Sequence, residues 1–145
     1  MDYKKIVNDL AQEVFDAIRP RVSPEDLERV RQAYLLAKEA HAPQRRKSGE
    51  PYILHPISVA LIVAKELQLD ANTVITAFLH DVVEDTPYTV EDIRQRFGND
   101  VAGLVNVVTK QKKETYHTTK QVDNYQQILA SLHYDTVVAK GEGVV

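Results

Sequence analysis

The residue types that this chain lacks narrow its possible chemistry. It has no cysteine, which excludes disulfides, thiolate zinc sites and cysteine nucleophiles. No apolar run approaches the roughly 20 residues that span a bilayer, and the N-terminus lacks the apolar core of a signal peptide. We therefore expect a cytoplasmic protein that does not bind a membrane.

The chain also lacks an excess of basic residues. Its formal net charge is −3, which argues against nucleic acid as a partner held by a basic surface. Because thiolates are missing, any metal site must use histidine and carboxylate ligands. Such ligands favour hard or borderline ions, for example manganese, zinc, iron or magnesium.

Glycine and proline are scarce, with five and six residues among 145, and no segment alternates convincingly between apolar and polar residues. The chain is long enough for one domain with its own core. Apolar spacing and capping residues predict an all-α helical bundle, with residues 110–118 as a polar, mobile loop. The helices are expected at about 3–19, 24–42, 57–67, 71–84, 90–97, 99–108 and 119–133.

The most informative segment is 80–86, His-Asp-Val-Val-Glu-Asp-Thr, which follows the apolar run 74–79. Its carboxylates are expected near the C-terminal end of a helix, where the macrodipole favours cations instead. Burying such charges is costly unless they are paired or bound to a metal. We therefore expect a cation over this turn, and a divalent metal is the sharpest candidate.

His55 is the obvious further ligand beside His80 and Asp81. It precedes Pro56, so we expect extended backbone at His55, just before a helix, with the imidazole pointing inward. If that helix packs beside the one carrying His80, both imidazoles and the carboxylate can reach one ion. The alternative interpretation is a buried core histidine at 55 and a surface dipeptide at 80–81.

Glu84 and Asp85 are candidates for the catalytic carboxylates. Each lies four residues after His80 or Asp81, so each pair is expected to share a helix face. A carboxylate beside a metal-bound water can take its proton or hold it in line. In the alternative interpretation, these two acids cap a helix or pair with arginines of the next one, at 94 or 96.

Residues 45–49, Arg-Arg-Lys-Ser-Gly, combine three cations with a hydroxyl and a flexible residue. Guanidinium groups bind phosphate in a bidentate manner or stack on a purine. The run lies close in sequence to His55, which favours a binding role. The alternative is a solvated charged loop, which is the interpretation we prefer for the basic stretch 110–113.

Two long segments, 46–57 and 80–86, closely resemble the hydrolase domain of the bacterial RelA/SpoT-type bifunctional (p)ppGpp synthetase/hydrolase enzymes. Residues 97–105, 108–110 and 122–125 are also similar to that family. The resemblance implies an all-helical fold of the HD phosphohydrolase superfamily. It also implies a manganese-dependent hydrolase that removes 3′-pyrophosphate from guanosine tetra- and pentaphosphate, the alarmones of the stringent response.

The resemblance also implies roles for particular residues. Matched to the family's motifs, His55, His80 and Asp81 become metal ligands, and Glu84 and Asp85 become the residues that position or activate water. The side chains of Arg46, Lys47 and Ser48 become contacts to the guanine nucleotide.

The C-terminal segment departs from the family's pattern. There the pattern continues into a hydrophobic helix whose aspartate is the fourth metal ligand, and Val145 stands near that position here. Residues 136–145 do not resemble this helix, and only proximity supports Glu142 as a substitute. We therefore expect a hydrolase domain at 1–135 and a divergent tail at 136–145. The tail is an edge segment, a disordered end or an artefact.

Three functions remain open at this point. The first is the hydrolase domain of a longer parent protein, here without the synthetase and regulatory domains. The second is an inactive nucleotide-binding remnant with an incomplete metal site. The third is a phosphohydrolase for another nucleotide. Because one ligand is missing, we expect weaker metal binding than in a complete family member, and alarmone hydrolysis that is absent or strongly impaired.

Overall fold

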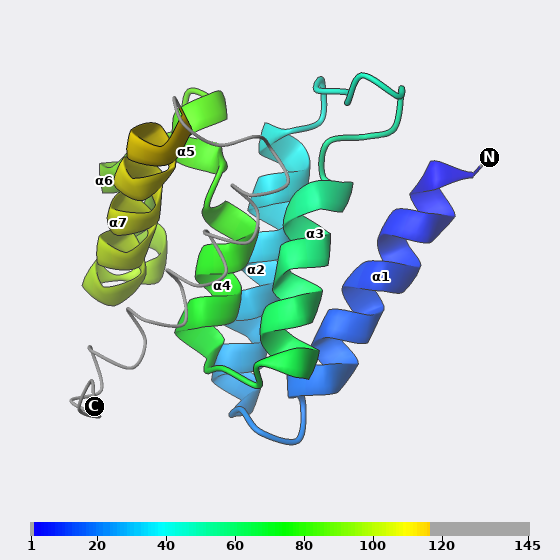
Figure 1. Cartoon of the computed structure of the whole chain (residues 1–145). Helices are drawn as coiled ribbons and strands as arrows, with labels where there is room; N and C mark the ends of the chain where they lie inside the picture. Colours follow the sequence, from blue (N-terminus) through cyan, green and yellow to red (C-terminus); the bar gives the residue numbers. More distant parts are fainter. Residues whose placement is uncertain (1, 117–145) are drawn as a thin grey trace.

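The computed structural model describes residues 2–116, which form helices joined by short loops, with no β-strand in that range (Figure 1). The predicted all-α fold is confirmed. The helices are α1 (Tyr3–Ile18), α2 (Pro24–Ala40), α3 (Leu54–Leu61), the π-helix η1 (Ile62–Glu66), α4 (Ala71–Leu79), α5 (Val82–Asp85), α6 (Val90–Phe97) and α7 (Asn99–Tyr116).

Capping residues begin several helices where the sequence predicts them. The Ser23 hydroxyl accepts a hydrogen bond from the Asp26 N–H at 3.1 Å, and Pro24 occupies the first turn of α2. Thr89 and Asp92 form a reciprocal capping box at the start of α6. These local bonds satisfy backbone N–H groups that have no partner within the helix.

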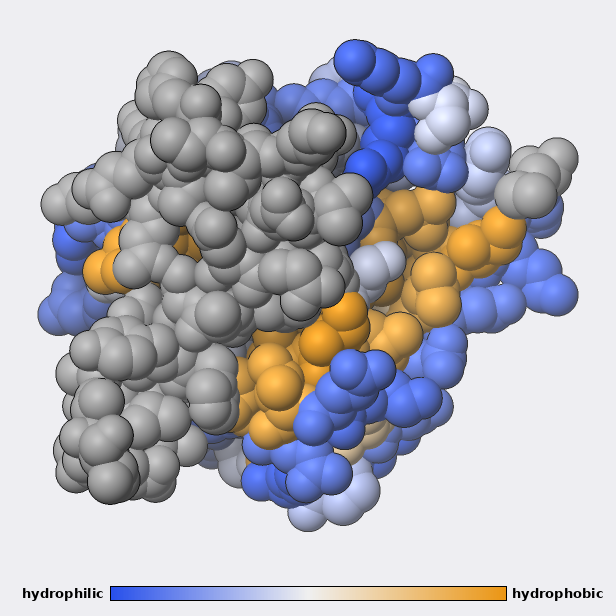
Figure 2. All heavy atoms as spheres, viewed as in Figure 1, coloured by the Kyte–Doolittle hydropathy of each residue, from blue (hydrophilic) through white to orange (hydrophobic). Residues whose placement is uncertain are grey.

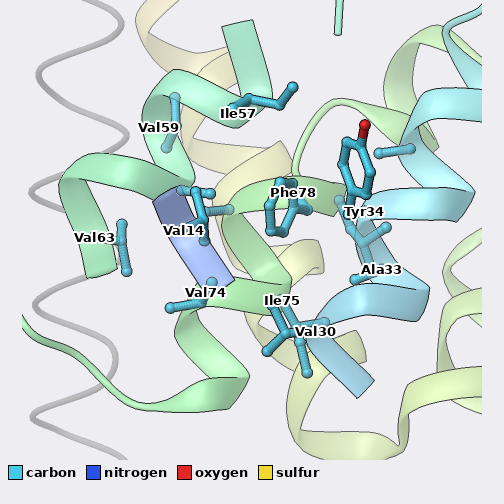
Figure 3. Packing of buried hydrophobic residues seen from close by; sticks show 14 of the residues in the cluster. Val14, Val30, Ala33, Tyr34, Ile57, Val59, Val63, Val74, Ile75 and Phe78 are labelled. Atoms are coloured by element: carbon cyan, nitrogen blue, oxygen red, sulfur yellow. The ribbon is translucent and has the colours of Figure 1, made fainter. Parts of the chain in front are cut away.

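Helix α4 forms the centre of the bundle. It packs against α2, α3 and α7, and every residue in it except Asn72 is buried. Figure 3 shows Phe78 of α4 surrounded by apolar side chains from neighbouring helices, with Tyr34 beside it. A helix that is apolar on all sides must lie in the interior. Its C-terminal end therefore brings His80 and Asp81 into the core.

Three helix boundaries differ from the prediction. Helix α3 begins at Leu54, before Pro56, because a proline in the first turn needs no intrahelical N–H bond. Helix α4 ends at Leu79, and α5 is a separate turn, whereas a single helix through Glu84 was predicted. The mobile loop predicted at 110–118 is wrong for 110–116, which continue α7. The helix predicted at 119–133 and the tail at 136–145 lie outside the described residues.

Backbone strain leads to a prediction at two positions. Gly98 closes α6 with φ +97° and ψ 173°, a region essentially restricted to glycine. We expect Gly98→Ala to lower the free energy of unfolding by about 1–3 kcal/mol, although an added Cβ would meet no atom within 4 Å.

Gln68 has φ +51°, so Gln68→Gly should have the opposite effect and raise the free energy of unfolding by up to about 1 kcal/mol. Urea denaturation measures both, and destabilisation by both variants would contradict this account.

Candidate metal centre

The predicted ligands meet at one end of the bundle. Helices α3 and α4 pack against each other and run in opposite directions, so the start of α3 lies beside the end of α4 (Figure 1). His55 is in the first turn of α3, and His80 and Asp81 follow α4 directly. The extended backbone predicted at His55 is wrong, but the helix still directs its imidazole toward the end of α4.

His55, His80 and Asp81 converge as predicted. One ligand atom from each lies within 4.8 Å of the others. The Asp81 Oδ2 atom is 3.2 Å from His80 Nε2 and 3.6 Å from His55 Nε2, and the two imidazole centroids are 5.3 Å apart. The side chains of His80 and Asp81 are fully buried, whereas that of His55 is 18% exposed. The cluster is therefore closed on the protein side and reached from the side of His55.

The protonation of His80 indicates that this cluster is suited to a cation. His80 Nδ1 lies 2.6 Å from the Ala77 carbonyl oxygen, which can only accept, so Nδ1 carries the proton. In a neutral ring, Nε2 then presents a lone pair toward Asp81 Oδ2. Two lone pairs at this separation repel each other, so the arrangement needs a proton shared between the two groups or a metal ion. A backbone carbonyl on the other ring nitrogen is typical of metal-binding histidines, and these three residues can bind a metal ion.

The break between α4 and α5 changes the predicted relation of the acids to the ligands. His80 caps α4 and Asp81 precedes α5, so His80 and Glu84 do not belong to one continuous helix as predicted. Glu84 and Asp85 are exposed in α5. Of the arginines considered as alternative partners, Arg94 pairs with Glu91, and Arg96 lies over the Tyr88 ring at 5.5 Å. The catalytic roles of Glu84 and Asp85 remain predictions.

The basic loop folds into a closed turn. The Arg46 N–H donates to the Glu50 carbonyl at 2.9 Å, and the Arg46 guanidinium lies 3.5 Å from the Glu50 carboxylate. The Ser48 hydroxyl donates to the same carboxylate at 3.0 Å. Lys47 and Ser48 are exposed. The turn thus holds Arg46 in place by two contacts with one residue.

Arg46 lines a hollow beside the predicted metal ligands. The hollow has a volume of about 330 Å³, and its polar lining residues are Arg46, Glu50, His55 and Ser58. Its apolar lining residues are Ile6, Leu10 and Leu54. In Figure 2, apolar side chains follow the junction of α1 and α3, and hydrophilic ones cover the loop above it. Lys47, Ser48 and His80 are not among the lining residues, so of the predicted loop contacts only Arg46 shares the hollow with a predicted metal ligand.

Comparison with known proteins gives the family of this chain. The sequence profile of the HD domain matches residues 33–139. The chain belongs to the HD domain family. This HD domain is 48% identical over 115 residues to the bifunctional (p)ppGpp synthase/hydrolase SpoT of Escherichia coli K12, a match that covers 77% of the chain and 16% of that protein.

Two further similarities extend this comparison. The HD domain is 47% identical over 112 residues to the guanosine-3′,5′-bis(diphosphate) 3′-pyrophosphohydrolase of Aquifex aeolicus, again covering 77% of the chain and 16% of the relative. It resembles a solved structure described as a metazoan orthologue of SpoT that hydrolyses ppGpp and plays a role in starvation responses. The TM-score is 0.58 at 27% identity, over 85% of this chain and 74% of that one. The HD domain thus spans about 16% of the length of these curated relatives. Among its described helices, none has the length and apolar character to cross a bilayer.

The structure adds residues around the predicted metal ligands that the sequence did not single out. The Tyr52 hydroxyl donates to Asp81 Oδ2 at 2.5 Å. The Gln44 side chain bridges His41 Nδ1, at 2.7 Å, and the Asp85 carbonyl oxygen, at 2.8 Å. Burial lowers the pKa of His41, and burial together with the neighbouring Asp81 raises the pKa of Tyr52. No sequence signal singled out Tyr52 or Gln44, because both lie in the loop between α2 and α3.

Proposed function

We propose that this HD domain is a metal-dependent 3′-pyrophosphohydrolase of guanosine tetra- and pentaphosphate. One observation carries the proposal: two histidines and an aspartate converge on one point beside a hollow lined by Arg46. The named activities of the relatives support the same substrate. A cation-binding cluster next to a guanidinium suits a substrate that is a polyphosphate anion.

In this proposal, one group of residues holds the metal ion and a second group handles the attacking water. His55, His80 and Asp81 hold the ion, for which manganese is our candidate. When bound, a divalent ion lowers the pKa of water and polarises a phosphate oxygen. Glu84 and Asp85 orient the attacking water and accept its proton. Water adds to the 3′-pyrophosphoryl group, the bond from phosphorus to the 3′ oxygen breaks, and the 3′ oxygen takes up a proton.

The loop residues bind the nucleotide in this proposal. Arg46, Lys47 and Ser48 contact the guanine nucleotide, with Arg46 nearest to the metal ligands. The guanidinium offers paired N–H donors to phosphate oxygens, and the exposed Lys47 and Ser48 add a positive charge and a hydroxyl at the rim. Arg46 would exchange its contact with Glu50 for one with substrate, because that contact is long and partly exposed.

Release of pyrophosphate from guanosine tetraphosphate tests the function. We expect release that requires Mn²⁺ and is lost with a chelator, because the ion activates the attacking water. Faster release of pyrophosphate from GTP than from guanosine tetraphosphate would contradict the proposed substrate. Binding of Mn²⁺ and nucleotide without release would support the inactive nucleotide-binding alternative. Absence of both binding and release would contradict the site altogether.

Arg46→Ala tests the nucleotide-binding loop. We expect the Kd for guanosine tetraphosphate to rise about tenfold, the equivalent of 1.4 kcal/mol, because a charge-assisted contact to phosphate is lost. The melting temperature should change little, because the pair with Glu50 is partly exposed. The matched control is Arg31→Ala, an exposed arginine of α2 outside the site. An equal loss of stability without weaker nucleotide binding would assign Arg46 a structural role.

A further inference from the structure

We propose that Tyr52 is a positioning residue for the metal centre, whose hydroxyl fixes the Asp81 carboxylate in the orientation that meets both imidazoles. The inference rests on the proposed function and extends it to a residue outside the ligand set. Its basis is the 2.5 Å hydrogen bond from the Tyr52 hydroxyl to Asp81 Oδ2.

The Tyr52 hydroxyl donates to the same Asp81 oxygen atom that faces both imidazoles. Asp81 Oδ2 accepts from Tyr52 and is also the atom that lies 3.2 Å from His80 Nε2 and 3.6 Å from His55 Nε2. Asp81 precedes α5, yet its side chain makes no capping bond to that helix. The carboxylate is turned instead toward the Tyr52 hydroxyl and the two imidazoles. A charge-assisted bond from a partly buried phenol is strong enough to select that orientation.

Tyr52 is itself held on several sides. Its ring packs against the His41 ring at 4.8 Å between centroids and against the His55 ring at 5.8 Å. Its N–H donates to the Gln44 carbonyl at 3.1 Å. His41 is 1% exposed, and the side chain of Gln44 joins it to the backbone of Asp85. The hydroxyl is therefore fixed by packing and backbone contacts before any ion arrives.

The Tyr52 hydroxyl affects metal affinity by orienting the Asp81 carboxylate, which it contacts. Residues that orient metal ligands typically change metal affinity by about 10- to 100-fold when they are replaced. Tyr52→Phe keeps the aromatic ring, and so its packing on His41 and His55, but removes the donor. We expect the Kd for Mn²⁺ to rise by about 10- to 100-fold.

The chain offers a matched control. Tyr34 is a buried tyrosine, and its hydroxyl makes no hydrogen bond within the described residues. Tyr34→Phe removes a hydroxyl of the same kind from a residue of α2. It should leave the Kd for Mn²⁺ within about twofold of the parent, because the hydroxyl that it removes has no role in orienting Asp81.

The experiment is a Mn²⁺ titration of the full chain and both variants, after removal of metal by a chelator, with free Mn²⁺ followed by electron paramagnetic resonance. Weaker binding by Tyr52→Phe alone supports the inference. Unchanged binding with a lower melting temperature would give Tyr52 a structural role and overturn it. Failure of the parent chain to bind Mn²⁺ would overturn the proposed metal site, and the inference with it.

Discussion

Asp81→Asn is expected to weaken Mn²⁺ binding at least a hundredfold. The substitution keeps the size of the side chain but removes the only negative charge among the three converging residues. Two neutral imidazoles and an amide do not compensate the charge of a divalent ion in a buried site, where charges need close partners. The change also places an amide group against the buried His80 Nε2 atom, 3.2 Å from the present oxygen.

The measurement is the same Mn²⁺ titration, with pyrophosphate release as a second readout. The control is Glu25→Gln, which neutralises an exposed acid in the first turn of α2, far from the cluster in the fold. It makes the same change in net charge and should bind Mn²⁺ like the parent. A similar loss in both variants would show that binding depends on overall charge, and would contradict a specific site at Asp81.

Phe78→Ala is expected to have the largest effect on stability, a loss of about 3–5 kcal/mol. The Phe78 side chain is fully buried and lies at the centre of the core, with the Tyr34 ring at 5.8 Å between centroids (Figure 3). Its truncation leaves a cavity that close-packed neighbours cannot fill. Because native domains are stable by only about 5–15 kcal/mol, this variant should be partly unfolded at moderate temperature.

Urea denaturation measures this effect, and the exposed apolar residues provide the control. Leu35 is 43% exposed on α2, so Leu35→Ala should change the free energy of unfolding by no more than about 0.5 kcal/mol. A loss below about 1 kcal/mol for Phe78→Ala would mean that the core reorganises around the missing ring.

The sequence predicts those parts of the fold that depend on local signals. Helices α1, α2 and α6 begin and end close to where Pro20, Ser23 and Thr89 indicate, because caps and prolines act within one turn. The break after Leu79 has no such signal. Both His80 and Asp81 keep right-handed helical backbone angles there, and the apolar pattern continues across them.

The same distinction applies to the site. His55, His80 and Asp81 could be predicted to converge because buried ionisable residues at the ends of neighbouring helices need partners. The contacts of Tyr52 and Gln44 could not be predicted, because they depend on the path of the loop between α2 and α3. That path is set by backbone bonds such as Tyr52 N–H to the Gln44 carbonyl, which the side-chain pattern does not encode.

The placement of the ligands has a consequence for the folded chain as a whole. His55 begins α3, whereas His80 and Asp81 follow α4, and η1 joins the two helices at the other end of the bundle. A bound ion would therefore close a loop of chain as a removable cross-link that the unfolded state cannot form. At one hundred times its Kd, such an ion adds about 2.7 kcal/mol to stability. The amount of folded protein would then follow the supply of metal.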